Sequence, residues 1–143
     1  MNWKEEATDK LRKYDAMRLA VTNIPEELER LEQEAGSLRG ADPSKTRIIS
    51  SKCQDSALIN NLVRRGELAS NFNQAQSWLR TTNRALEALT PEERLVLHRL
   101  YICPERGSLE RLCCELGVEQ SSIYRKRDKA LHRFTMALYG VDS

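Results

Sequence analysis

The sequence predicts an all-α protein, with an N-terminal helical hairpin or coiled-coil-like region followed by a C-terminal helix-turn-helix. Glycine and proline are scarce, at six and four of 143 residues, so few positions oppose helix formation. Long stretches rich in Leu, Ala, Glu and Arg carry apolar residues at three- and four-residue steps, which is the helical period. We expect the N-terminal region to span residues 1–89 and the C-terminal domain residues 90–143.

The N-terminal region is expected to begin with two helices. The first runs from about residue 2 to residue 22. Asn23-Ile24-Pro25 interrupts it, because proline lacks a backbone donor and restricts the residue before it. Pro25 then takes the first position of a second helix, which has carboxylates in its first turn. Gly36 and Gly40 mark the end of that helix.

Residues 39–54 lack helical periodicity and are expected to form a mobile linker. The basic residues of this segment would suit an arm that contacts phosphate, but an ordinary solvated loop is the simpler interpretation. These basic residues are Arg39, Lys45, Arg47 and Lys52.

A long helix is expected after the linker, from an N-cap at Asp55 to about Ala88. Its apolar seam alternates steps of four and three residues, which is typical of a packed or coiled-coil face. This seam would either join two copies of the chain as a homodimer or pack on the first two helices of the same chain. It consists of Leu68, Phe72, Ala75, Leu79, Thr82, Leu86 and Leu89.

The C-terminal domain opens with a capping box. Thr90 supplies the hydroxyl cap, Pro91 the first helical position and Glu93 the carboxylate three residues after the cap. Residues 102–107 end this helix, and Ser108 is expected to cap the next one, which reaches residue 116.

A turn at Gly117 then leads into a last helix, from about Gln120 or Ser121 to Tyr139. A short helix, a glycine turn and a longer helix are the sequence form of a helix-turn-helix. Cys113 supplies a small residue where the two helices cross, and Gly117 permits a positive φ. The apolar side chains expected inside the corner are Leu112, Leu116, Val118 and Ile123.

Charge is distributed unevenly along the chain. Residues 1–36 carry six Lys/Arg and nine Asp/Glu, whereas residues 37–90 carry eight and four. Across residues 121–139, five basic residues are opposed only by Asp128. Basic residues concentrated on one helix are typical of a surface that binds phosphate.

The C-terminal residues resemble region four of bacterial sigma factors. The resemblance rests on Leu116-Gly117-Val118, the charged stretch into Lys129-Ala130-Leu131, and the upstream segment 89–97, and it covers about 45 of the 143 residues. The Ser-Ile-Tyr-Arg-Lys-Arg segment, residues 122–127, more closely resembles the RinA/ArpU-type phage late-gene regulators. The resemblance implies a phage or prophage transcription regulator that binds double-stranded promoter DNA and acts with the bacterial RNA polymerase.

Two departures from the sigma-factor pattern shape this expectation. Lys126 stands where sigma factors place an apolar residue, so the inward face of the last helix is expected to differ. Residues 1–89 also lack an aromatic-rich segment like the promoter-melting region, which favours an auxiliary regulator. Two alternatives remain open: an oligomerising small terminase subunit that packages DNA, and a helical adaptor that binds no DNA.

The DNA-contacting residues are expected on the last helix. A helix fits the major groove, and residues near its N-terminus face the base edges. Residues further along the helix contact phosphates, which fix the register of the protein. We assign base contacts to Gln120, Ser121, Ser122, Tyr124 and Arg125, and phosphate contacts to Lys126, Lys129 and Arg133.

Several residues of this helix have a more specific or an alternative assignment. Arg125 is the candidate for a bidentate contact with guanine, and the amides of Ser121 and Ser122 are expected to be free for a phosphate. Tyr124 is equally suited to packing on the corner, and Arg127 and Arg133 to pairing with acids of another helix.

Other classes of function are set aside. A zinc site from Cys103, Cys113, Cys114, His98 and His132 is not expected, because their spacing lacks a Cys-x-x-Cys pair. The sequence shows no phosphate loop, nucleophile elbow or His-Glu-x-x-His motif, so we expect neither an enzyme nor a cofactor. An acidic N-terminus and the lack of long apolar runs favour a cytoplasmic protein without a membrane partner.

Overall fold

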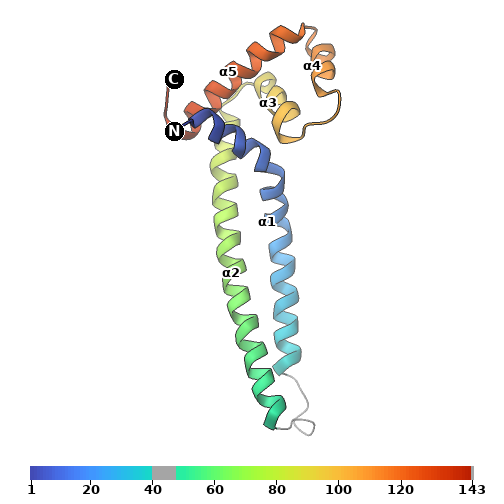
Figure 1. Cartoon of the computed structure of the whole chain (residues 1–143), viewed down its shortest axis with the longest axis vertical. Helices are drawn as coiled ribbons and strands as arrows, with labels where there is room; N and C mark the ends of the chain where they lie inside the picture. The colour runs from blue at the N-terminus through green and yellow to red at the C-terminus, as the bar shows by residue number, and fades with distance from the viewer. Residues whose placement is uncertain (40–47, 143) are drawn as a thin grey trace. The chain divides into compact units, whose positions relative to one another are not determined.

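The computed structural model describes residues 1–39 and 48–142, with side chains from residue 53 onward in the second range. These residues form helices and no strands, which confirms the all-α class. No helix in the described ranges is both long enough and apolar enough to cross a membrane. The elements in order are α1 (Trp3–Arg39), α2 (Ile48–Glu87), α3 (Pro91–Leu97), the π-helical turn η2 (His98–Ile102), α4 (Ser108–Leu116) and α5 (Gln120–Tyr139) (Figure 1).

The chain packs into two compact units. Unit 1 comprises Met1–Arg18 and Ser77–Ser143, and unit 2 comprises Leu19–Gln76. Unit 1 therefore joins the start of α1 and the end of α2 to everything that follows them. The expected domain boundary after residue 89 falls inside unit 1. The division of the chain into two domains at that boundary stays a prediction.

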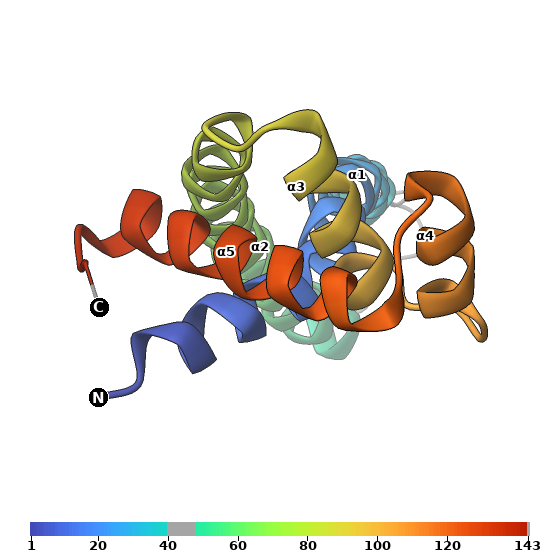
Figure 2. The same ribbon diagram turned by 90° about the horizontal axis from the view of Figure 1, so that it is seen from above.

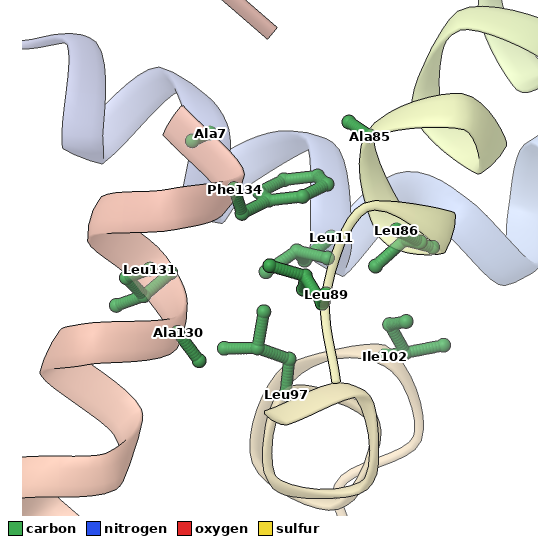
Figure 3. Close-up of a cluster of buried hydrophobic side chains, with 10 residues drawn as sticks. All are labelled: Ala7, Leu11, Ala85, Leu86, Leu89, Leu97, Ile102, Ala130, Leu131 and Phe134. Atoms are coloured by element: carbon green, nitrogen blue, oxygen red, sulfur yellow. The ribbon is translucent and has the colours of Figure 1, made fainter. Parts of the chain in front are cut away.

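The core of unit 1 draws on both ends of the chain (Figure 3). Leu11 of α1, Leu97 of α3 and Phe134 of α5 are completely buried in one cluster. Burying side chains of this size contributes about 1.5–3 kcal/mol each, so the cluster fixes α3 and α5 against the start of α1. Its other members are Ala7, Ala85, Leu86, Leu89, Ile102, Ala130 and Leu131.

The predicted break at residues 23–25 is wrong, because α1 continues through Pro25. Proline inside a helix costs about 3 kcal/mol or more. However, Val21, Ile24 and Leu28 keep the three- and four-residue spacing on either side of the proline, and they are half-buried while Pro25 is exposed. The packed face is thus uninterrupted, and the proline ring lies on the solvent side.

The linker and the N-cap at Asp55 are also corrected. Residues 40–47, which include Lys45 and Arg47, lie outside the described residues, whereas α2 already begins at Ile48, ahead of Asp55. The inward-facing positions of this part of α2 include the polar residues Gln54 and Asn61, which concealed the helical period. The predicted linker therefore wrongly included residues 48–54, which belong to α2.

The apolar seam of α2 packs within the chain. In unit 2, Ala75 is buried and Leu68 and Phe72 are half-buried. In unit 1, the remaining seam residues Leu79, Thr82, Leu86 and Leu89 are all buried. Of the two alternatives for this seam, the structure supports packing on the same chain rather than a homodimer.

Unit 2 consists of two helical segments lying side by side, from α1 and α2 (Figure 1). Asn61 is buried between them, and its Nδ2 donates a hydrogen bond to the carbonyl oxygen of Leu31 at 2.9 Å. Its Oδ1 accepts from Nε of Arg65 at 2.8 Å. A single buried amide of this kind favours one register of two packed helices over others.

Candidate nucleic-acid interface

The buried face of α5 decides which of its side chains are exposed. Ile123, Ala130 and Phe134 are completely buried, at the spacing of one helical face. They pack on α3 and α4, and Figure 2 shows α5 running alongside α3 and meeting α4 at the turn. The opposite face of α5 carries Ser121, Arg125 and Lys129 outward.

The corner between α4 and α5 has a small apolar core of its own. Leu112, Ile123 and Val96 are completely buried, so α3 contributes to the corner as well. The other predicted corner residues, Cys113, Leu116 and Val118, pack against this cluster as partly buried side chains.

Backbone geometry turns the chain at this corner. Gly117 has φ of +64°, as predicted, and its amide donates to the carbonyl of Cys113. The amide of Val118 donates to the same carbonyl at 3.1 Å. This left-handed ending leaves residues 117–119 to connect the two helices.

The predicted cap at Ser108 is wrong. Gly107, with φ of +82°, is the residue before α4, and Ser108 is the first residue of the helix. The Ser108 hydroxyl accepts a hydrogen bond from the amide of Glu105 at 2.9 Å instead. It thus closes the preceding loop rather than the first turn of α4.

The N-terminus of α5 differs in part from expectation. The amides of Ser122 and Ile123 donate to the carbonyl of Glu119, at 3.0 and 3.2 Å, so the Ser122 amide is not free for a phosphate. Glu119 is the N-cap residue, but its side chain makes no capping hydrogen bond. Its exposed carboxylate lies next to Gln120, at the end of the helix assigned to base contacts.

Gln120 and Tyr124 form a local pair on the surface. Nε2 of Gln120 lies 3.2 Å from the Tyr124 hydroxyl. The guanidinium of Arg127 lies 5.0 Å from the centre of the Tyr124 ring and also pairs with Asp128 at 2.9 Å. Tyr124 is 40% exposed, so it faces solvent while its ring is covered on one side by Arg127.

Arg125 and Lys129 are the cations of α5 that remain available. Both are exposed, and neither has an ion-pair partner among residues 1–39 and 53–142. They are four residues apart, so they lie on the same face one turn from each other.

Lys126 and Arg133 are held by acids of α3. Nζ of Lys126 lies 2.5 Å from Oε1 of Glu92, and Nη1 of Arg133 lies 3.0 Å from Oε1 of Glu93. For Arg133 this is the alternative left open by the sequence, a pair with an acid of another helix. For Lys126 the pair with Glu92 accounts for a charged side chain that is half-buried beside α3.

Sequence reasoning missed the three carboxylates beside the basic helix. Glu93 was predicted only as the carboxylate of the capping box, and Glu92 lies beside it in the first turn of α3. The capping box does form, since the Glu93 carboxylate accepts a hydrogen bond from the Thr90 amide and the Thr90 hydroxyl accepts one from the Glu93 amide. Only the packing of α3 on α5 reveals the second role of these acids, and Glu119 could have been recognised from its position directly before the helix.

The cysteines do not gather into a ligand set. In the part of the chain that the structure describes, no group of three or more His, Cys, Asp or Glu residues could hold a metal ion. Cys53, Cys103, Cys113 and Cys114 are all free thiols.

The chain was compared with protein-family models, with curated proteins and with solved structures, and none of them matches it.

Proposed function

We propose that this protein binds double-stranded DNA through α4, the turn at 117–119 and α5, used as a helix-turn-helix with α5 in the major groove. The observation that carries the proposal is the exposed pair Arg125 and Lys129, free of acidic partners within the described residues. Both lie on a helix whose opposite face is anchored in the core. A rigid helix with an unneutralised basic outer face is suited to a groove lined by phosphates.

The two cations take different roles in this proposal. Arg125, near the start of α5, contacts a base edge, with guanine as the best match for its guanidinium. Lys129, one turn later, contacts a phosphate and contributes affinity without sequence preference. The other residues assigned to base contacts lie near the same end of α5: Gln120, Ser121 and Tyr124 are exposed and Ser122 is half-buried.

The acids that hold Lys126 and Arg133 limit the electrostatic part of binding. The logarithm of the binding constant falls with the logarithm of the salt concentration, with a slope of about −0.9 per phosphate contacted. If Lys129 is the one of these cations that contacts a phosphate, we expect a slope of about −1, and a slope of about −3 if Lys126 and Arg133 exchange their carboxylates for phosphates. The slope therefore reports how many of these three cations contact phosphates.

The resemblance to sigma-factor region four and to RinA/ArpU-type regulators extends this proposal to a biological role. We propose a phage or prophage regulator that binds promoter DNA and acts with the RNA polymerase of the bacterial host. A small terminase subunit would use the same helix on DNA but assemble into a large ring. A helical adaptor would bind an acidic protein and not DNA.

The testing experiment is selection of bound fragments from a random duplex library. The wild-type chain is compared with Arg125→Ala, Lys129→Ala and the control Arg80→Ala, which removes an exposed charge from α2. We expect one enriched motif, relaxed at one position by Arg125→Ala at a cost of about 1–3 kcal/mol in binding. Lys129→Ala should weaken binding to all sequences alike and reduce the salt slope by about 1.

Two outcomes would contradict the proposal. Enrichment unchanged by Arg125→Ala would remove α5 as the base-contacting helix. Binding weakened equally by Arg80→Ala and Lys129→Ala would show that net charge, and not this face, accounts for the affinity.

A further inference from the structure

A cavity of about 350 Å³ opens on the surface of unit 1, where the start of α1, the end of α2, α3 and η2 meet. Its volume falls within the range of about 300–1,000 Å³ that is typical of small-molecule sites. No acidic residue in the part of the chain that the structure describes lines it. Most of its wall is apolar or aromatic, formed by Tyr14, Leu86, Pro91, Leu95 and Ile102.

The apolar wall of the cavity rests on the packed core. Leu86 of α2 and Ile102 of η2 are buried members of the core cluster of unit 1. Leu95 of α3 is half-buried and packs against the smaller cluster of the corner. The ring of Tyr14 is fixed beside them, because its hydroxyl donates a hydrogen bond to Oδ1 of Asn83 on α2. The cavity is therefore formed by side chains that are already held in place, which lowers the cost of ordering them when a ligand binds.

The π-helical turn η2 shapes one side of the cavity. The turn begins at His98 and ends at Ile102, and both residues line the cavity. It is closed by the Cys103 amide, which donates to the carbonyl of His98 at 2.9 Å. Single π-helical turns are rare and frequently occur at functional sites. The DNA interface proposed on α4 and α5 makes no use of this turn, so its place beside the cavity points to a separate function.

Arg94 and His98 bring polar groups to the edge of this apolar cavity. They are four residues apart, so they lie on one face of the helix, and both are exposed. Neither side chain has a hydrogen-bond or ion-pair partner among residues 1–39 and 53–142. The planar guanidinium of arginine matches a carboxylate with two parallel hydrogen bonds. The cavity thus combines an apolar interior with an unneutralised cation at its edge.

We propose that this cavity binds a small organic anion, with the apolar body of the ligand inside the cavity and its carboxylate paired with Arg94. The charge of the cavity selects this class of ligand, because Arg94 repels an apolar cation and a neutral hydrocarbon leaves the guanidinium donors unused. Arg125 and Lys129, the cations assigned to DNA, do not line the cavity. The proposal therefore goes beyond the proposed function and does not depend on DNA binding by α5.

The test is isothermal titration calorimetry of the full-length chain without DNA, with octanoate, octylammonium and acetate as probes. We expect octanoate to saturate one site. Octylammonium, which lacks the negative charge, and acetate, which lacks the apolar chain, should bind at least about tenfold more weakly. Amide chemical shifts measured by NMR locate the site: octanoate should shift the signals of residues 94–102 and leave those of residues 120–129 unchanged.

A charge reversal tests the role of Arg94. Arg94→Glu should weaken octanoate binding by about tenfold and strengthen octylammonium binding, a gain that an unfolded variant would not show. Arg106→Glu is the matched control, because Arg106 is also exposed in unit 1 but does not line the cavity, and it should leave both affinities unchanged. A wild-type chain that octanoate does not saturate would overturn the proposal. Equal effects of the two substitutions, or shifts confined to residues outside the cavity, would overturn it as well.

Discussion

One carboxylate oxygen of Glu93 in α3 accepts hydrogen bonds from both Arg133 of α5 and the Thr90 amide at the cap of α3. Nη1 of Arg133 lies 3.0 Å from Oε1 of Glu93, and the Thr90 amide lies 3.3 Å from the same oxygen. The Glu93 side chain is only 10% exposed, and its other oxygen, Oε2, is buried without a hydrogen-bond partner among the described residues. The beginning of α3 and the second half of α5 are thus stabilised by one buried charge.

Removing Arg133 is expected to affect stability more than DNA binding. Arg133→Ala leaves the Glu93 carboxylate buried without its cation, and we expect a loss of about 1–2 kcal/mol in the free energy of unfolding. The full penalty for a broken buried pair is reduced here because Arg133 is partly exposed. Urea unfolding followed by circular dichroism measures the change. Arg125→Ala is the comparison, with an expected change within about 0.5 kcal/mol; equal losses in the two variants would show that Glu93 does not depend on Arg133.

Glu119→Gln is expected to strengthen DNA binding. The carboxylate stands at the N-cap of α5 and repels phosphates near the residues assigned to base contacts. Its loss should raise affinity for all duplexes at low salt and lower the unfolding free energy by about 0.3–1 kcal/mol, because a negative charge at a helix N-terminus is favourable. Fluorescence anisotropy with a labelled duplex measures the affinity. Unchanged affinity at low salt would place the DNA away from this end of α5.

The same substitution at two glycines is expected to have opposite effects. Gly117→Ala places a Cβ at φ of +64° and should destabilise the chain by about 1–2 kcal/mol. Gly36→Ala lies on an exposed helical position with open space and should stabilise it by about 0.4–1 kcal/mol. Thermal unfolding of both variants measures the difference. A neutral Gly117→Ala would mean that the turn before α5 adopts another conformation in solution.

Asn61 is expected to favour one register of the two packed helices rather than to stabilise the fold. Asn61→Leu replaces the amide buried between the two helical segments of unit 2 with an apolar side chain and should raise the unfolding free energy by about 1 kcal/mol or more. Asn61→Ala, which removes the hydrogen bonds with Leu31 and Arg65 without adding apolar contacts, should lower it by about 1–2 kcal/mol. A loss of stability in Asn61→Leu as large as in Asn61→Ala would contradict this assignment.

Several features that a local rule decides were predicted correctly from the sequence. The capping box at Thr90, the left-handed Gly117 and the extent of α5 all follow from residues within a few positions of each other. The apolar corner of Leu112 and Ile123 follows from helical spacing once the turn is placed.

Local rules failed wherever packing overrides them. Pro25 opposes helix by itself, but the half-buried residues around it continue one packed face. The π-helical turn His98–Ile102 has no sequence rule to predict it, and its last residue, Ile102, reaches the core of unit 1.

The candidate site was likewise predictable only where the helical spacing of α5 decides it. Exposure of Arg125 and Lys129 follows from the helical period, because the apolar residues Ile123 and Ala130 fix the inward face. Neutralisation of Lys126 and Arg133 depends on where α3 crosses α5, which no local pattern specifies.

The shared core of unit 1 has a consequence for synthesis of the chain on the ribosome. Ala7 and Leu11 bury their side chains against residues as late as Phe134. Translation at about 5–20 residues per second separates the appearance of these partners by roughly ten seconds. During that interval the first residues of α1 lack their native neighbours, so the core that holds α5 can form only after synthesis has passed Phe134. An incomplete translation product would therefore lack the rigid outer face on which DNA binding is proposed to depend.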